Sequence, residues 1–63
     1  MAMPVFAYGK LRPLRQAKGL TQGEIAAELG ISRPTYVLME QGQREPTLSQ
    51  LYTLSRLLGV EIS

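Results

Sequence analysis

The 63-residue sequence contains no cysteine, no histidine and no tryptophan. Without cysteine, neither disulfide bonds nor a cysteine-based metal site can stabilise the fold. Without histidine, the chain lacks the usual general base of enzymes and the commonest metal ligand. Five acidic residues remain, and we find no pair of them placed for acid–base chemistry. We therefore expect no enzymatic activity and no cofactor.

Long apolar runs are also missing. No run approaches the 18 or so residues that a membrane span requires. The opening segment MAMPVFAYGK is too short and too weakly apolar for a signal peptide. A chain of this length forms at most one small domain with a marginal core. The sequence predicts a single domain over residues 1–63, located in the cytoplasm and without a membrane partner.

The seven basic and five acidic residues are unevenly distributed, although the net charge is only +2. Four basic residues fall within the first 18 positions, which contain no acid: Lys10, Arg12, Arg15 and Lys18. A basic patch there suits an anionic partner. A solvated helix face is the alternative, and for Lys10, Arg12 and Lys18 solubility is favoured over direct contact.

Helix start and stop signals recur, while strand signals are nearly absent. Thr21–Glu24 forms a capping box, in which each of the two side chains bonds the other residue's backbone N–H. Gly30 then permits the left-handed turn that ends this helix. Ser32 is expected to cap the next helix, with Pro34 at a position whose N–H would be unpaired anyway. Gly42 is expected to end that helix.

Two further helices lie on either side of this pair. Thr47–Gln50 is a second capping box, and Gly59 follows as a stop signal. Between them, leucines recur at helical spacing: Leu48, Leu51, Leu54 and Leu58. In the first helix Pro13 must lie within the first turn, so Lys10 or a later residue must be the cap. Gly19 is its expected stop signal.

Residues 1–9 form an N-terminal extension outside the first helix. Phe6 and Tyr8 are expected to fold back onto the domain. A frayed tail is the alternative, because chain termini are often poorly ordered.

Two helices joined by a tight glycine turn make a helix-turn-helix at about residues 21–42. Ala26 supplies the small side chain that a close helix crossing requires, and Gly30 the turn. With these features, residues 11–60 resemble the Cro/repressor-type (XRE-like) helix-turn-helix family. The resemblance implies an all-α, compact four- to five-helix repressor-like domain. It also implies binding to double-stranded DNA, usually as a homodimer, with the third helix in the major groove.

The resemblance also assigns roles to single residues. Gln22 would bind a phosphate at the start of the second helix, and Arg33 would be the main base reader. The other expected DNA contacts are Ser32, Pro34, Thr35, Val37, Leu38 and Arg44. Arg15 and Glu40 match the family's partly buried ion pair. The alternatives are an ordinary polar surface residue for Gln22, a solvated charge for Arg33, and unrelated surface charges for Arg15 and Glu40.

Four consecutive bulky apolar residues occupy positions 36–39 of the third helix. A helical wheel places Tyr36 and Met39 on one side and Val37 and Leu38 on the other. We expect the first pair in the core and the second pair mostly exposed. Polar or basic residues are commoner at the outer positions in the family. Outward apolar side chains could contact thymine methyl groups or a partner protein.

Several apolar residues near the C-terminus exceed the apparent needs of a four-helix core: Tyr52, Leu57, Val60 and Ile62. They predict a homodimer that forms through the fourth helix and the C-terminal tail, although the family's usual fifth helix is missing. The function predicted is sequence-specific binding of double-stranded DNA by a repressor or autoregulator on an operator. The alternative is an antitoxin-like module that binds a toxin or other regulatory protein through the third helix.

Overall fold

The structure, a computed structural model, describes residues 8–60. In this range the chain forms a 3-10 turn, Tyr8–Lys10, and four α-helices. The helices are α1 (Leu11–Ala17), α2 (Gln22–Leu29), α3 (Arg33–Glu40) and α4 (Leu48–Leu58). The all-α prediction is confirmed. The predicted contact of Phe6 and the predicted role of Ile62 concern positions outside the described residues.

Local hydrogen bonds determine where α2 begins and ends, as the sequence predicts. The Thr21 hydroxyl accepts from the backbone N–H of Glu24 at 3.0 Å, and the Thr21 N–H donates to the Glu24 carboxylate at 2.8 Å. At the other end, Gly30 has a φ of 72°, a left-handed conformation that favours glycine. The turn is closed by a 3.0 Å bond from the Ile31 N–H to the Ala26 carbonyl.

The predicted caps of α3 and α4 also form. Ser32 accepts from the Thr35 N–H at 3.3 Å at the start of α3, where Pro34 is the second residue. Thr47 and Gln50 make a second reciprocal capping box at the start of α4. The α1 helix begins after Lys10, which places Pro13 third in the helix. The first four N–H groups of a helix have no partner within it, so the proline there removes no bond.

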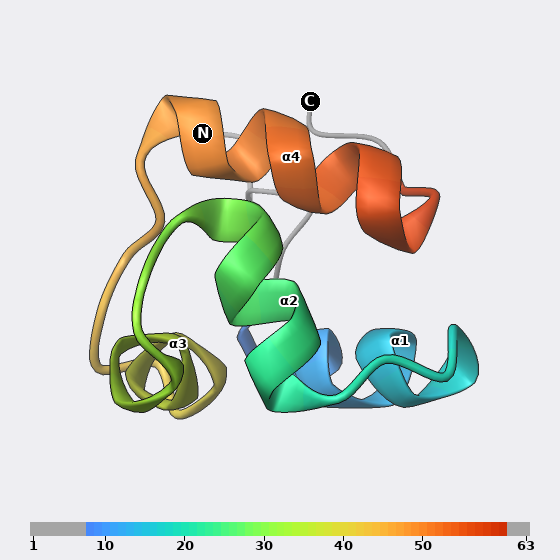
Figure 1. The fold of residues 1–63 in the computed structure, drawn as a ribbon, viewed down its shortest axis with the longest axis horizontal. Coiled ribbons are helices and arrows are strands. Elements are labelled where there is room, and N and C mark those ends of the chain that lie inside the picture. Colours follow the sequence, from blue (N-terminus) through green and yellow to red (C-terminus); the bar gives the residue numbers. More distant parts are fainter. Residues whose placement is uncertain (1–7, 61–63) are drawn as a thin grey trace.

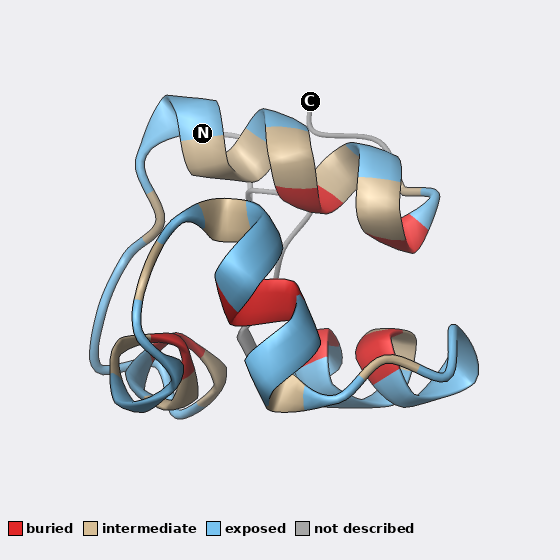
Figure 2. Cartoon of the chain, in the orientation of Figure 1, coloured by how far each residue is buried: buried red, intermediate tan, exposed pale blue. Residues whose placement is uncertain are grey.

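The core lies where the four helices face one another. In Figure 1, α2 runs through the middle of the molecule, α4 crosses above it, and α1 and α3 lie below on either side. Buried residues appear on the inward side of each helix in Figure 2. The buried apolar side chains are Leu11, Ile25, Ala26, Tyr36, Met39, Leu54 and Leu58. Within residues 8–60, no helix is both long and apolar enough to cross a membrane.

The structure corrects one expectation about α4 and the turn after it. Leu57 and Val60 are half-buried and pack against the core of their own chain, so they are not surplus to it. The Val60 N–H bonds the Ser55 carbonyl at 3.2 Å, and this turn brings Val60 back onto the domain. By contrast, Leu48 is 64% exposed because it is the first residue of α4, beyond the edge of the core.

Candidate nucleic-acid interface

The start of α3 presents polar and apolar side chains to solvent. Ser32, Arg33 and Pro34 are exposed at this end, and Thr35 is half-buried beneath them. Further along the outer face, Leu38 is 38% exposed. Gln22 is half-buried at the start of α2, and Arg44 is exposed in the loop that follows α3. The structure therefore brings Ser32, Arg33 and Pro34 together at the start of α3, with Gln22 at the start of α2 and Arg44 in the loop after α3.

The predicted ion pair joins α1 to the end of α3. Arg15 Nε lies 2.6 Å from Glu40 Oε2, and the two side chains are only 9% and 6% exposed. A second guanidinium nitrogen, Arg15 Nη1, donates to the Leu20 carbonyl at 2.8 Å. Charges removed from water are tolerated when they are paired and hydrogen-bonded. These bonds satisfy much of the buried charge and tie three segments of the chain together.

The environment of the pair shifts the protonation of both partners. Burial, the largest single influence, would raise the pKa of Glu40, but the interactions with Arg15, Tyr36 and Gln22 together outweigh it and lower the pKa. The hydrogen bond with Glu40 raises the pKa of Arg15. Both residues are therefore charged around neutral pH, and the pair contributes to stability as an ion pair.

Acid should weaken this contribution. A carboxylate whose pKa is lowered by folding stabilises the native state above its unfolded-state pKa, here near 4.5, and the effect disappears as the pH falls through the lowered value. We expect the free energy of unfolding to fall more steeply with acid below pH 4.5 in the wild type than in Glu40→Gln, which cannot titrate there. Urea denaturation at a series of pH values measures this. Parallel pH profiles for the two proteins would contradict it.

Gln22 connects the ion pair to the exposed arginine of α3. Its amide nitrogen donates to Glu40 Oε1 at 3.1 Å, and its amide oxygen accepts from Arg33 Nη2 at 3.1 Å. The ionised Glu40 can only accept a hydrogen bond, and Arg33 can only donate one. If the Gln22 amide were rotated by 180°, its oxygen would face the Glu40 carboxylate and its NH2 group would face the Arg33 guanidinium, and neither bond could form. Gln22 therefore holds Arg33 in a defined position in the free protein.

Tyr36 lies beneath this chain of hydrogen bonds. Its side chain is fully buried, and within residues 8–60 its hydroxyl has no hydrogen-bond partner. Burial, assisted by the neighbouring Glu40 carboxylate, raises the pKa of the phenol. Tyr36 thus stays neutral at physiological pH and acts as a core residue, as the helical wheel predicted.

The prediction for Val37 is wrong in part. Tyr36 and Met39 are fully buried and Leu38 is exposed, as expected, but Val37 is half-buried. Residues three and four apart on a helix are neighbours, so Val37 lies beside Arg33 and Glu40. Both of these side chains are held against Gln22, which places Val37 on the covered flank of α3 rather than on its outer face.

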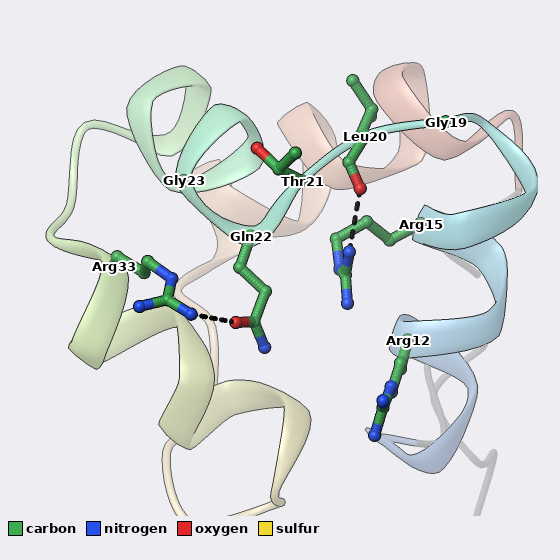
Figure 3. A pocket seen from close by; sticks show the side chains of 8 residues that line it. All are labelled: Arg12, Arg15, Gly19, Leu20, Thr21, Gln22, Gly23 and Arg33. Carbon is green, nitrogen blue, oxygen red and sulfur yellow. Dashed lines mark hydrogen bonds between the residues drawn. The ribbon is translucent and has the colours of Figure 1, made fainter.

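An open hollow lies between α1, the start of α2 and the start of α3 (Figure 3). It is lined by Arg12, Arg15, Gly19, Leu20, Thr21, Gln22, Gly23 and Arg33. Three of these residues are arginines, and none is acidic. Solubility is the role that the sequence alone favours for Arg12. Arg12 and Arg15 are three residues apart, a spacing that places both on one side of α1 and that could have indicated their common position beside the hollow.

Comparison with known proteins identifies the family. Residues 11–63 match the helix-turn-helix family. A transcriptional regulator of this type from Sinorhizobium fredii is 47% identical over 47 residues, which cover 75% of this chain and 61% of the relative. The cryptic phage CTXphi transcriptional repressor RstR of Vibrio cholerae is 35% identical over 54 residues, covering 86% of this chain and 49% of the repressor. The chain therefore spans about half to three fifths of the length of these two relatives.

A solved structure shows the same arrangement of helices. The restriction-modification controller protein C.AhdI from Aeromonas hydrophila superimposes with a TM-score of 0.73 and 37% sequence identity. The match covers 86% of this chain and 78% of the controller protein. Fold, helix caps and sequence agree: the chain belongs to the Cro/repressor-type (XRE-like) helix-turn-helix family of transcriptional regulators.

Proposed function

We propose that the protein binds double-stranded DNA at a specific sequence and represses transcription by occupying an operator. The observation that carries the proposal is the position of Arg33, exposed at the start of α3 and held by Gln22 beside a hollow without acidic residues. In helix-turn-helix proteins, the start of the second helix of the motif meets the base edges in the major groove. A guanidinium fits the O6 and N7 acceptors of guanine.

The neighbouring residues have supporting roles in this proposal. The exposed Pro34 and Leu38 present apolar surface to the groove, where a thymine methyl group is a suitable contact. Ser32, Thr35 and Arg44 contact the sugar-phosphate backbone. Gln22 uses one amide hydrogen on Glu40, which leaves the second for a phosphate.

The proposal includes a homodimer that forms through α4. Leu48 and Tyr52 are 64% and 59% exposed and lie one helical turn apart, which places two large apolar side chains on one outer face. Leu57 and Val60 pack against the core of their own chain, so only the exposed parts of their side chains contribute to the proposed dimer interface. We propose that a second copy of the chain covers this face of α4. In the resulting two-fold dimer the two α3 helices would lie about one DNA turn apart, roughly 34 Å. With DNA as the proposed target, we propose that the protein acts in the cytoplasm.

Selection of bound sequences from a random duplex pool tests the function. We expect an enriched inverted repeat whose half-sites are about one turn apart. The Arg33→Ala variant should lose about 1–3 kcal/mol of discrimination at one base pair in each half-site, because a bidentate contact is removed. Wild-type and variant selections, read by sequencing, give both results. A pool without an enriched sequence would contradict specific binding.

Salt dependence separates this function from the antitoxin-like alternative. Binding driven by phosphate contacts weakens steeply as salt rises, roughly in proportion to the number of contacts. An apolar contact of Leu38 with a partner protein would change little over the same range. Affinity for duplex DNA that falls steeply between low and physiological salt supports the operator proposal. A salt-insensitive complex with a protein, formed without affinity for DNA, favours the alternative.

A further inference from the structure

We propose that Glu40 is a positioning residue for DNA recognition, which acts through Gln22 to set how strongly Arg33 discriminates between base pairs. The inference rests on the proposed function, in which Arg33 reads a base. It goes beyond the ion pair with Arg15, because it gives the second oxygen of the same carboxylate a part in sequence recognition.

The two oxygens of the Glu40 carboxylate have different partners. Oε2 accepts from Arg15 Nε at 2.6 Å, and Oε1 accepts from Gln22 Nε2 at 3.1 Å. The first bond ties the carboxylate to α1, and the second ties it to the start of α2. The Glu40 side chain is only 6% exposed, so it is covered from solvent and from DNA. Any influence of Glu40 on a base must therefore pass through a neighbouring side chain.

Gln22 spans the distance between Glu40 and Arg33. These two residues are the last and the first of α3, so they lie on one flank of the helix but about 10 Å apart along its axis. The Gln22 amide bonds Glu40 Oε1 with its nitrogen and Arg33 Nη2 with its oxygen, at 3.1 Å each. Figure 3 shows the bond to Arg33. Arg15, Glu40, Gln22 and Arg33 thus form one hydrogen-bond chain.

The hydrogen-bond chain restricts Arg33 without using up its recognition groups. The bond to Gln22 occupies one of the five guanidinium N–H groups and leaves four for guanine. Ordering a long, exposed side chain at the moment of binding weakens a contact by about two- to tenfold. Positioning Arg33 in advance removes this loss at the base pair that Arg33 recognises, and a different base pair there gains nothing from it. Glu40 should therefore affect discrimination more than overall affinity.

A carboxylate at position 40 serves both neighbours with a separate oxygen for each. The Glu40→Gln side chain keeps one oxygen and gains an NH2 group, so it cannot accept from Arg15 and from Gln22 with different atoms. If the new NH2 group faces Gln22, the Gln22 amide reverses to accept from it. The NH2 group of Gln22 would then face Arg33, and two donors would meet. Glu40→Gln therefore breaks or reverses the hydrogen-bond chain.

Comparing Glu40→Gln with Glu28→Gln tests the inference. Glu28→Gln removes the same charge from an exposed position of α2. Fluorescence anisotropy gives the dissociation constants for the selected duplex and for one changed at the base pair where Arg33→Ala loses preference. We expect the ratio of these two constants to fall roughly two- to tenfold in Glu40→Gln and to stay unchanged in Glu28→Gln. The uniform effect of protein charge on affinity cancels in this ratio.

A second variant separates positioning from a general loosening of the domain. Gln22→Met breaks the hydrogen-bond chain and leaves the ion pair intact, so it should lower the ratio as Glu40→Gln does. In the Gln22→Met background, Glu40→Gln should lower the ratio no further, because residues that act through one another are not additive. Nuclear magnetic resonance relaxation of the Arg33 Nε–H group should show greater mobility in both single variants and no change in Glu28→Gln.

The binding measurements are made at a temperature at which circular dichroism shows every variant to be folded. If Glu40→Gln does not fold, the double variant Arg15→Met with Glu40→Leu takes its place. This variant removes the acceptor of Gln22 without leaving a buried charge unpaired. It should show the same fall in the ratio as Gln22→Met.

The outcomes distinguish the inference from the function on which it rests. If the wild type binds no duplex, or prefers no base pair, the proposed function fails. If the wild type discriminates and a folded Glu40→Gln keeps the full ratio, Glu40 supports only the fold and the inference is wrong. Additive losses from Gln22→Met and Glu40→Gln would also overturn it. A higher ratio in Glu40→Gln would show that Gln22 withholds Arg33 from guanine, which is the opposite of the proposed role.

Discussion

Replacing Glu40 with alanine is expected to lower the free energy of unfolding by about 3 kcal/mol, because it leaves the buried guanidinium of Arg15 without its counter-charge. The same change removes the acceptor that orients Gln22. A domain of this size has a total stability of roughly 3–9 kcal/mol, so the variant would lose about a third or more of it, and at the lower end of this range about half of the molecules would be unfolded. Urea denaturation followed by circular dichroism measures the change.

Two further variants show whether charge is the cause. Glu28→Ala removes an exposed acid from α2 and should alter stability by no more than about 0.5 kcal/mol. The double variant Arg15→Met with Glu40→Leu removes both charges and should recover much of the loss, since an apolar pair carries no desolvation cost. A Glu40→Ala variant as stable as Glu28→Ala would show that the ion pair adds nothing to the fold.

The second large effect is expected inside α3. Met39 is fully buried and Leu38 is 38% exposed, although the two are adjacent in sequence. Met39→Ala should cost about 2–5 kcal/mol because it leaves a cavity in the core. Leu38→Gln should cost no more than about 0.5 kcal/mol. Since 1 kcal/mol shifts the melting temperature of a small domain by about 4–8 °C, calorimetry separates the two variants.

This pair of variants also reports on the orientation of α3. If Leu38→Gln were as destabilising as Met39→Ala, the helix would be rotated relative to the core. The apolar face proposed to meet thymine methyl groups would then be an inner face. A stable Leu38→Gln variant with altered preference at a thymine-containing position would support both the orientation and the proposed groove contact.

Most of the fold could be predicted from the sequence because its signals are local. Thr21 with Glu24, and Thr47 with Gln50, determine the starts of two helices through bonds that span three residues. The helical wheel separated Tyr36 from Leu38 for the same reason, since helix geometry alone decides which side chains share a face.

The remaining features depend on contacts between segments that are distant in sequence. The partial burial of Val37 could not be predicted, because a helical wheel shows on which side of a helix a residue lies but not which side neighbouring segments cover. Leu57 and Val60 looked surplus because the sequence gives no measure of how much apolar surface the core can accept. The link from Glu40 through Gln22 to Arg33 was missed because each residue alone had an ordinary role. These side chains meet only after α2 and α3 have packed together.

The helix caps have a consequence for the rate at which the chain folds. Each of α2, α3 and α4 has a start signal within its own first turn and a glycine with positive φ after its last turn. Helical domains dominated by such short-range contacts fold in microseconds to milliseconds, because little loop-closure entropy is lost before contacts form. The Arg15–Glu40 bond, which joins residues 25 positions apart, can form only after α1 meets α3. Much of its stabilising effect should therefore appear as a slower rate of unfolding, and little of it as a faster rate of folding.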